Sequence, residues 1–305
     1  MRILFIGQAA FGADALKALI DQGETIAGVI TVPDSKGAGV NSLKHLALER
    51  NLPLLQTVRL KDPQVVAWVA ARQPDLLVLA YVTQFVPKEM IALARFGGIN
   101  YHPSLLPKYR GGSAMNWAII RGEKETGVTI HQIDEGVDTG PILLQEKVSI
   151  DADETVKTLY FKKLYPLGVR MIAEAVRLIR EGKVTPRPQD ERLASYQPVI
   201  QEEDVRIHWG NGTQQIYNLI RGSNPYPGAT TFFRNQKLKI WEARPSSGRG
   251  DPGRVIEIRR DEGFAVATGD GALWVERVQW AEGPKTPSAD FICGQGLKSG
   301  DRLGE

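Results

Sequence analysis

Three side chains in the middle of the chain have the types and the spacing that acid–base chemistry requires: Asn100, His102 and Asp138. Asn100 and His102 stand two residues apart in a run that reads as the end of a short β-strand, so they point to the same side. Asp138 lies in a turn-rich segment that follows a second strand-like run, residues 127–133. If the two strands are neighbours, Asp138 can reach His102, and an amide, an imidazole and a carboxylate share one crevice.

The bend after His102 is constrained by prolines. Pro103 and Pro107 each fix φ and lack a backbone donor, so the segment between them leaves the strand in a set direction. Asp134 and Glu135 are further carboxylates in the turn-rich segment, and either could take the place of Asp138. The remaining histidines lack a comparable setting and are interpreted as structural: His45, His131 and His208.

This part of the sequence resembles the signature of the formyltransferases that use 10-formyltetrahydrofolate. The resemblance is carried by the HPSLLP run at residues 102–107, by the Arg-Gly pair at 110–111 and by the Asp-Thr-Gly run at 138–140. It extends over residues 1–241. It implies an enzyme that moves a formyl group from 10-formyltetrahydrofolate to an acceptor amine through a tetrahedral intermediate.

The resemblance also implies roles for the three side chains. Asn100 and His102 donate hydrogen bonds to the oxyanion of the intermediate, where one preorganised donor typically contributes about 3–4 kcal/mol. Asp138 matches the carboxylate of the family because it directly precedes Thr-Gly. It either favours the protonated form of His102 or acts through a bound water as a general base, and the sequence leaves both roles open.

Two loops are implied as the folate pocket, one after the strand at residues 76–81 and one before Asp138. Their candidate folate contacts are Phe85, Val86, Ile133, Asp134, Glu135, Gly136 and Val137. Candidate contacts to an anionic acceptor are Ser104, Lys108 and Arg110. The turn at residues 7–12 has Ala9 where a dinucleotide-binding fingerprint has its second glycine, so we expect this turn to line a substrate crevice instead.

The acceptor is left open among an amino sugar of a sugar nucleotide, an aminoacyl-tRNA and another small amine. Family members that act on tRNA have a longer, basic insertion after the second strand, whereas residues 32–40 are short and nearly neutral, so a tRNA partner is not favoured. Members that hydrolyse the folate have an apolar residue at the position of Asn100, and hydrolysis with release of formate is the alternative function. A non-catalytic folate- or nucleotide-binding module is a second alternative.

Alternating apolar runs and helix-forming stretches in the first half predict an α/β fold with a parallel sheet. With the resemblance, this becomes a Rossmann-like, folate-binding formyltransferase domain over residues 1–182. Residues 183–204 are rich in proline and charge and read as a linker. Residues 205–305 hold five short strand-like runs separated by Gly and Pro, which predicts a small β-barrel-like, OB-like domain.

Length and composition fit a two-domain enzyme of 305 residues. The net charge is +3, and the 38 basic and 35 acidic residues are interspersed rather than gathered in the basic patch of a dedicated nucleic-acid domain. One cysteine, Cys293, excludes an intramolecular disulfide, and the scattered histidines predict no metal site. Without a signal peptide or an apolar run near 20 residues, we expect a cytoplasmic chain with no membrane partner. The oligomeric state is left open.

Overall fold

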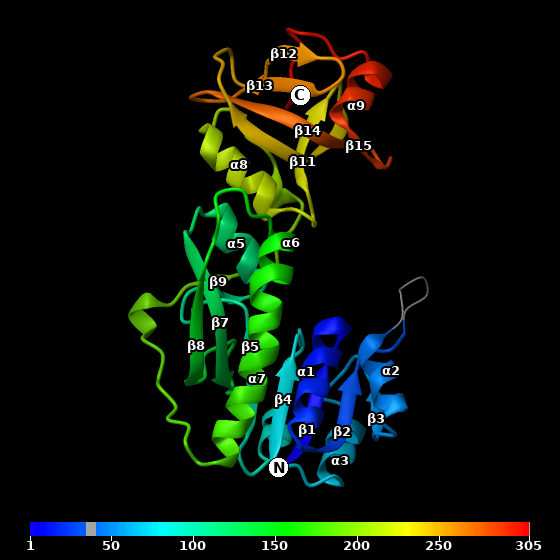
Figure 1. The fold of residues 1–305 in the computed structure, drawn as a ribbon, viewed down its shortest axis with the longest axis vertical. Coiled ribbons are helices and arrows are strands. Elements are labelled where there is room, and N and C mark those ends of the chain that lie inside the picture. Colours follow the sequence, from blue (N-terminus) through cyan, green and yellow to red (C-terminus); the bar gives the residue numbers. More distant parts are fainter. Residues whose placement is uncertain (35–40, 305) are drawn as a thin grey trace. The chain divides into compact units, whose positions relative to one another are not determined.

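The computed structural model describes residues 1–34 and 41–304 (Figure 1). Contacts divide the chain into two compact units. The first comprises Met1–Gly111, Thr126–Val148 and Phe161–Tyr196, and the second comprises Gly112–Glu125, Ser149–Tyr160 and Gln197–Glu305. The domain boundaries expected at residues 182 and 204 stay a prediction. The two contact-based units do not follow those boundaries, because residues 112–125 and 149–160 pack with the C-terminal part of the chain.

A seven-stranded sheet in the order β3-β2-β1-β4-β5-β7-β8 forms the centre of the first unit (Figure 1). Its strands are β1 (Arg2–Gly7), β2 (Thr25–Thr31), β3 (Leu54–Gln56), β4 (Leu76–Ala80), β5 (Gly98–His102), β7 (Glu125–Gln132) and β8 (Ile142–Ser149). Strands β1 to β5 pair in parallel, and β7 runs antiparallel to β5. This parallel-rich sheet with intervening helices confirms the predicted α/β class.

The parallel strands are apolar on both faces because helices cover both faces. The helices of this unit are α1 (Ala9–Asp21), α2 (Ser42–Glu49), α3 (Pro63–Ala70), α4 (Lys88–Ile91) and α7 (Tyr165–Arg180). Leu4 and Leu77 belong to a core cluster with residues of α3 and α4. On the opposite face, the ring of Phe11 in α1 lies 4.4 Å from the ring of Tyr101 and 5.3 Å from that of Tyr165. The sheet is thus the middle layer of three.

The helical stretch from Val156 to Arg180 changes its geometry along its length. Thr155 caps α6 (Val156–Leu159) by accepting a hydrogen bond from the backbone of Thr158. A π-helical turn, Tyr160–Leu164, follows, and α7 then begins with Pro166 in its first turn. Because proline has no N–H group, it cannot give the bond that would continue the α-helix, so the backbone widens before it.

The second unit contains an antiparallel sheet in the order β10-β11-β14-β13-β12, with β15 paired to β14. Its strands are β10 (Ala229–Phe233), β11 (Gln236–Ser246), β12 (Val255–Arg259), β13 (Gly263–Ala267), β14 (Ala272–Trp280) and β15 (Lys285–Pro287), and its helices besides α6 are α5 (Ala114–Ile120), α8 (Thr213–Gly222) and α9 (Ser288–Gln295). Trp209, Phe233, Phe264 and Phe291 belong to its core. The β-rich C-terminal part predicted from the sequence is confirmed as this antiparallel-sheet domain.

Several shorter elements complete the fold. Strand β6 (Arg110–Gly111) pairs with β9 (Tyr196–Gln197), and two 3-10 turns span Glu191–Leu193 and Glu203–Val205. Among the helices of residues 1–34 and 41–304, none is long and apolar enough to cross a bilayer.

Gly168 in α7 tests the packing of the helices on the sheet. A Cβ at this position would lie 2.4 Å from Cε2 of Tyr101 and 3.0 Å from Cε2 of Phe11. Alanine favours a helix interior over glycine by up to about 1 kcal/mol, but overpacking a core costs about 1–3 kcal/mol. We therefore expect Gly168→Ala to lower the free energy of unfolding, measured by chemical denaturation. The matched control is Gly294→Ala in α9, where a Cβ meets no atom within 4 Å and stability should hold or rise. Equal effects of the two changes would contradict this packing.

Candidate active site

The pairing of β5 with β7 brings the three predicted side chains together. In the antiparallel register, Asn100 lies opposite His131 and His102 lies opposite Thr129. The loop after β7 then returns Asp138 to both β5 residues. Its Oδ2 atom lies 3.4 Å from Nδ1 of His102, and its Oδ1 atom lies 3.3 Å from Nδ2 of Asn100. The geometric expectation that Asp138 reaches His102 is thus met.

Thr129 fixes the bend that follows His102. Its fully buried hydroxyl donates to the carbonyl of Ser104 over 2.7 Å and accepts from the backbone N–H of Leu106 over 3.2 Å. The hydroxyl of Ser104, also fully buried, donates to the carbonyl of Lys108 over 2.7 Å. Ser104 therefore stabilises the bend, while the side chain of Lys108 is exposed. Their contact with an acceptor stays a prediction.

His102 is buried, and its surroundings determine which nitrogen carries hydrogen. Its Nε2 atom lies 2.7 Å from the carbonyl oxygen of Tyr109, which can only accept, so Nε2 is protonated. Burial lowers the pKa of His102 below the usual 6.5, although the Asp138 carboxylate and the Tyr109 carbonyl oppose this. In the neutral ring, the lone pair of Nδ1 therefore faces Oδ2 of Asp138. The two facing atoms are both acceptors, and one proton between them would turn this contact into a charge-assisted hydrogen bond.

Asp138 remains a carboxylate despite its burial. Burial alone raises its pKa, but the hydrogen bond from His131, the positive charge available on His102 and His131, and the backbone N–H of Gly111 lower the pKa more, to about 2. The Gly111 N–H donates to Oδ2 over 2.9 Å. Asp138 itself has a φ of 54°, a backbone conformation that Asp tolerates better than most residues. Its charge is therefore held at one place throughout the neutral range.

His131 belongs to this cluster, which corrects its interpretation as a structural histidine outside the site. Its Nε2 atom lies 3.3 Å from Oδ1 of Asp138 and 3.2 Å from Nδ2 of Asn100. Its Nδ1 atom lies 2.7 Å from the carbonyl of Gln132, an acceptor, so Nδ1 carries a hydrogen. Nε2 accepts from Asn100 when the ring is neutral and donates to Asp138 when the ring is protonated. The signal in the sequence is its place opposite Asn100, which only the strand register reveals.

The amide of Asn100 bridges its two neighbours. Nδ2 faces Asp138 and His131 at 3.3 and 3.2 Å, both longer than the usual hydrogen bond of about 2.9–3.0 Å. Because the carboxylate can only accept, the nitrogen and not the oxygen of the amide must point toward it. These long bonds hold the amide in place without saturating it.

Arg110 is engaged by an ion pair next to this cluster. Its guanidinium makes two bonds to the carboxylate of Glu191, of 2.7 and 2.9 Å, and donates to Gln189. The hydrogen bonds to Glu191 raise the pKa of Arg110. Gln189 in turn donates to the carbonyls of Asp138 and Gly140. Through Gln189, Arg110 therefore stabilises the loop that holds Asp138. A contact between Arg110 and an acceptor stays a prediction.

The two predicted folate loops lie beside each other. Val86 is buried in the cluster of α3 and α4, and Ile133 packs against the same cluster. The exposed side chains of Lys88 and Glu135 form an ion pair between the two loops. Phe85 is 68 % exposed, which leaves its ring open to a ligand. All folate contacts stay predictions.

The loop before Asp138 is closed by its own hydrogen bonds. Oδ1 of Asp134 accepts from the backbone N–H of Gly136 over 3.1 Å and from the hydroxyl of Thr139 over 2.6 Å. A Cβ on Gly136 would lie 2.0 Å from that hydroxyl oxygen, so glycine is needed there. Val137 is half-buried. Asp134 thus shapes the turn, and Asp138 is left as the carboxylate of the cluster.

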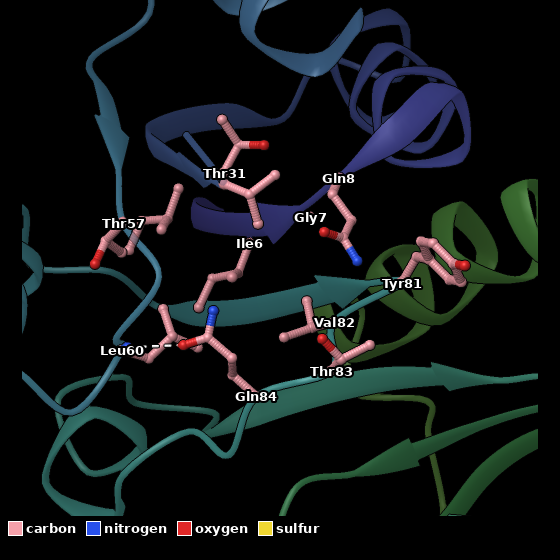
Figure 2. Close-up of a pocket in the computed structure, with 12 residues that line it drawn as sticks. Ile6, Gly7, Gln8, Thr31, Thr57, Leu60, Tyr81, Val82, Thr83 and Gln84 are labelled. Atoms are coloured by element: carbon pink, nitrogen blue, oxygen red, sulfur yellow. Dashed lines mark hydrogen bonds between the residues drawn. The ribbon is translucent and has the colours of Figure 1, made fainter. Parts of the chain in front are cut away.

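A pocket opens at the carboxyl ends of β1, β2 and β4 (Figure 2). The strand order reverses at β1, because β2 lies on one side of β1 and β4 lies on the other. Open α/β sheets bind ligands in the crevice at such a switch point. Gly7 and Gln8 line the pocket, together with Thr31, Tyr81 and Gln84 (Figure 2). The turn that was expected to line a crevice does line this pocket, and its occupant stays a prediction. Among the described residues, no group of three His, Cys, Asp or Glu side chains is placed to hold a metal ion.

Known proteins are similar to this sequence over nearly its whole length. Residues 1–176 match the family described as "Formyl transferase", and residues 199–296 match "Formyl transferase, C-terminal domain". The methionyl-tRNA formyltransferase of Citrifermentans bemidjiense is 37 % identical over 310 residues, which cover 100 % of this chain and 97 % of that protein. The enzyme of the same name from Thermodesulfovibrio yellowstonii is 38 % identical, over 98 % of this chain and 97 % of that protein.

Solved structures share the fold at lower identity. HypX from Aquifex aeolicus, in complex with tetrahydrofolic acid, superposes with a TM-score of 0.67 at 23 % identity, over 96 % of this chain and 47 % of that one. An N-formyltransferase from Helicobacter canadensis, in complex with folinic acid and dTDP-3-aminofucose, has a TM-score of 0.68 at 21 % identity, over 90 % of this chain and 98 % of that one. The matched domains and the relatives of equal length lead to one conclusion: the chain belongs to the formyltransferase family, as its resemblance predicted.

Proposed function

We propose that this chain transfers the formyl group of 10-formyltetrahydrofolate to the amino group of methionyl-tRNA. The observation that supports this acceptor is the similarity to methionyl-tRNA formyltransferases at 36–38 % identity, with nearly the full length of both proteins covered. The solved sugar N-formyltransferases are only 19–22 % identical and support the fold alone.

This proposal revises the expectation that a tRNA partner is not favoured. That expectation was based on the short, nearly neutral segment 32–40, of which residues 35–40 lie outside the described residues. The absence of that insertion affects one loop. The similarity to methionyl-tRNA formyltransferases extends over both matched domains, so we give the similarity more weight than the loop.

The proton of the attacking amine goes to the His102–Asp138 pair. As the amine nitrogen bonds to the formyl carbon, the carbonyl oxygen becomes an oxyanion and the nitrogen must lose a proton. Nδ1 of neutral His102 faces the Asp138 carboxylate with no hydrogen between them, so the pair can take up this proton. When the intermediate collapses, the same proton is returned to the departing folate nitrogen, and the site is ready for another turnover.

The oxyanion is stabilised by Asn100. The two bonds that hold its amide are long, so a developing negative charge can draw one amide hydrogen toward itself. His131 acts as a positioning residue, because its Nε2 keeps the amide nitrogen directed into the cluster. Members of the family that hydrolyse the folate have an apolar residue at the position of Asn100, so this amide supports transfer over release of formate.

The acceptor can be tested directly with 10-formyltetrahydrofolate and three reaction mixtures: methionyl-tRNA, an amino-sugar nucleotide, and no acceptor. We expect formylmethionyl-tRNA to form much faster than a formylated sugar or free formate. His102→Gln should lower the rate by about 10²–10⁴-fold, the usual range for loss of a general acid–base group. His45→Gln, on the exposed side of α2, is the matched control and should leave the rate unchanged. Faster formylation of the sugar, or formate release at the same rate without acceptor, would overturn the proposal.

The pH dependence of turnover tests the proton acceptor. His102 must be neutral to accept a proton, and its pKa lies below 6.5, so activity should fall only as the pH drops through that lower value. The acceptor amine must also be neutral to attack, so its protonation lowers activity at acidic pH by the same amount in every variant. In Asp138→Asn the carboxylate no longer favours the protonated ring, so the His102 limb should move to lower pH in the residual activity. The assignment fails if this limb stays in place or moves to higher pH.

A further inference from the structure

A second cavity lies entirely within the second unit and shares no residue with the cluster around Asp138. Its volume is about 670 Å³, which is in the range of sites that bind small molecules. It is lined by the end of α5 with the Arg121 that follows it, by the segment from Asp204 to Asn211 and by one face of α8. Its charged, amide and aromatic lining side chains include Trp117, Arg121, Asp204, Arg206 and Asn218.

Two arginines in this cavity have no carboxylate partner among the residues that the structure describes. Arg121 donates to the neutral amide oxygen of Gln197 over 3.3 Å, and its guanidinium carbon lies 5.9 Å from the ring centre of Trp117. Arg206 lies above the ring of Phe232, at 5.4 Å. Guanidinium groups usually face carboxylates or phosphates when they line a concave site, since both match their donors.

The acidic group in the lining is already occupied. Asp204 is the one acid among the described lining residues, and its Oδ2 atom accepts from the backbone N–H of Gln201 over 2.8 Å. It therefore offsets part of the positive charge without pairing with either arginine. The cavity keeps an excess of positive charge and favours an anion.

Asn218 adds an unused donor to the same cavity. The residue is 7 % exposed, and its Oδ1 atom accepts from Nε and Nη2 of Arg221 and from Gln214. Because Arg221 can only donate, the atom facing it must be the amide oxygen, so the orientation of the amide is settled. Nδ2 donates to no atom of the described residues, so it can donate to a ligand oxygen.

Trp117 supplies a flat apolar surface beside these donors. Its indole N–H donates to the carbonyl of Pro198 over 2.9 Å, which holds the half-buried ring in one orientation. A held indole is a stacking surface for a planar ring, and stacking on aromatic side chains is a usual way to bind a nucleobase.

We propose that this cavity binds a small ligand that joins a phosphate group to a planar ring, of the nucleoside monophosphate type. Arg121, Arg206 and the amide of Asn218 contact the phosphate, and the indole of Trp117 contacts the ring. The volume of the cavity is in the range of small-molecule sites, so we favour a free nucleotide over an RNA strand. The site does not depend on the acceptor assigned to the catalytic cluster.

Calorimetric titration of the whole protein with AMP tests this site, with adenosine, inorganic phosphate and a CCA trinucleotide as comparison ligands. We expect AMP to bind, adenosine to bind more weakly, and phosphate to compete with AMP. Arg121→Ala and Arg206→Ala should each weaken AMP binding by about tenfold or more, the effect of losing a charged hydrogen bond. Arg260→Ala, an exposed arginine between β12 and β13, is the matched control and should bind AMP like the parent protein.

Asn218→Asp protects the test against a simple folding defect. The carboxylate keeps an oxygen for Arg221, so α8 should stay folded by circular dichroism, while its charge repels the phosphate and removes the donor. AMP binding should then be lost in a folded protein. The proposal is overturned if AMP does not bind, if all variants bind it equally, or if the trinucleotide binds while AMP does not.

Discussion

The antiparallel pairing of β5 with β7 is the constraint on which the cluster around Asp138 depends. The other pairs in the sheet from β3 to β5 are parallel, and their loops lead away into helices. At β5 the direction reverses, so Asn100 faces His131 across the ladder and the loop after β7 returns to the end of β5. A slip of one residue would turn these side chains to the opposite face of the sheet. Thr129 prevents this by bonding to the bend that follows β5.

The charge of Asp138 organises the rest of the cluster. A buried carboxylate without partners is strongly disfavoured, and this one has a backbone N–H, an amide and two imidazoles around it. Each imidazole also forms a hydrogen bond to a backbone carbonyl through its other nitrogen: His102 to Tyr109, and His131 to Gln132. The result is a carboxylate that stays ionised and two rings whose hydrogens are placed by carbonyl groups of the backbone. The proposed proton transfer requires this placement of hydrogens.

Much of this site could be predicted from the sequence, because short runs of neighbouring residues indicate it. The bend with two prolines and the Asp-Thr-Gly run identify Asn100, His102 and Asp138 before any fold is known. His131 was missed because its place opposite Asn100 depends on a strand register, and residues far apart in sequence determine it.

Arg110 and Ser104 show a related limit. A guanidinium or a hydroxyl near a site has the same sequence pattern whether it binds a ligand or holds a loop, and only burial and partners distinguish them. Residues 112–125 also pack with the C-terminal half, which no periodicity predicts.

In the proposed mechanism the His102–Asp138 pair lacks one proton at rest, with hydrogen on Nε2 of His102 and none on Nδ1. Nitrogen NMR of protein labelled with ¹⁵N-histidine measures this directly, because protonated and unprotonated ring nitrogens have well separated chemical shifts. At neutral pH we expect a protonated Nε2 and an unprotonated Nδ1 for the ring whose signals are missing from the spectrum of His102→Gln. A hydrogen on Nδ1 at that pH, in the neutral or the doubly protonated ring, would overturn the proposed proton transfer.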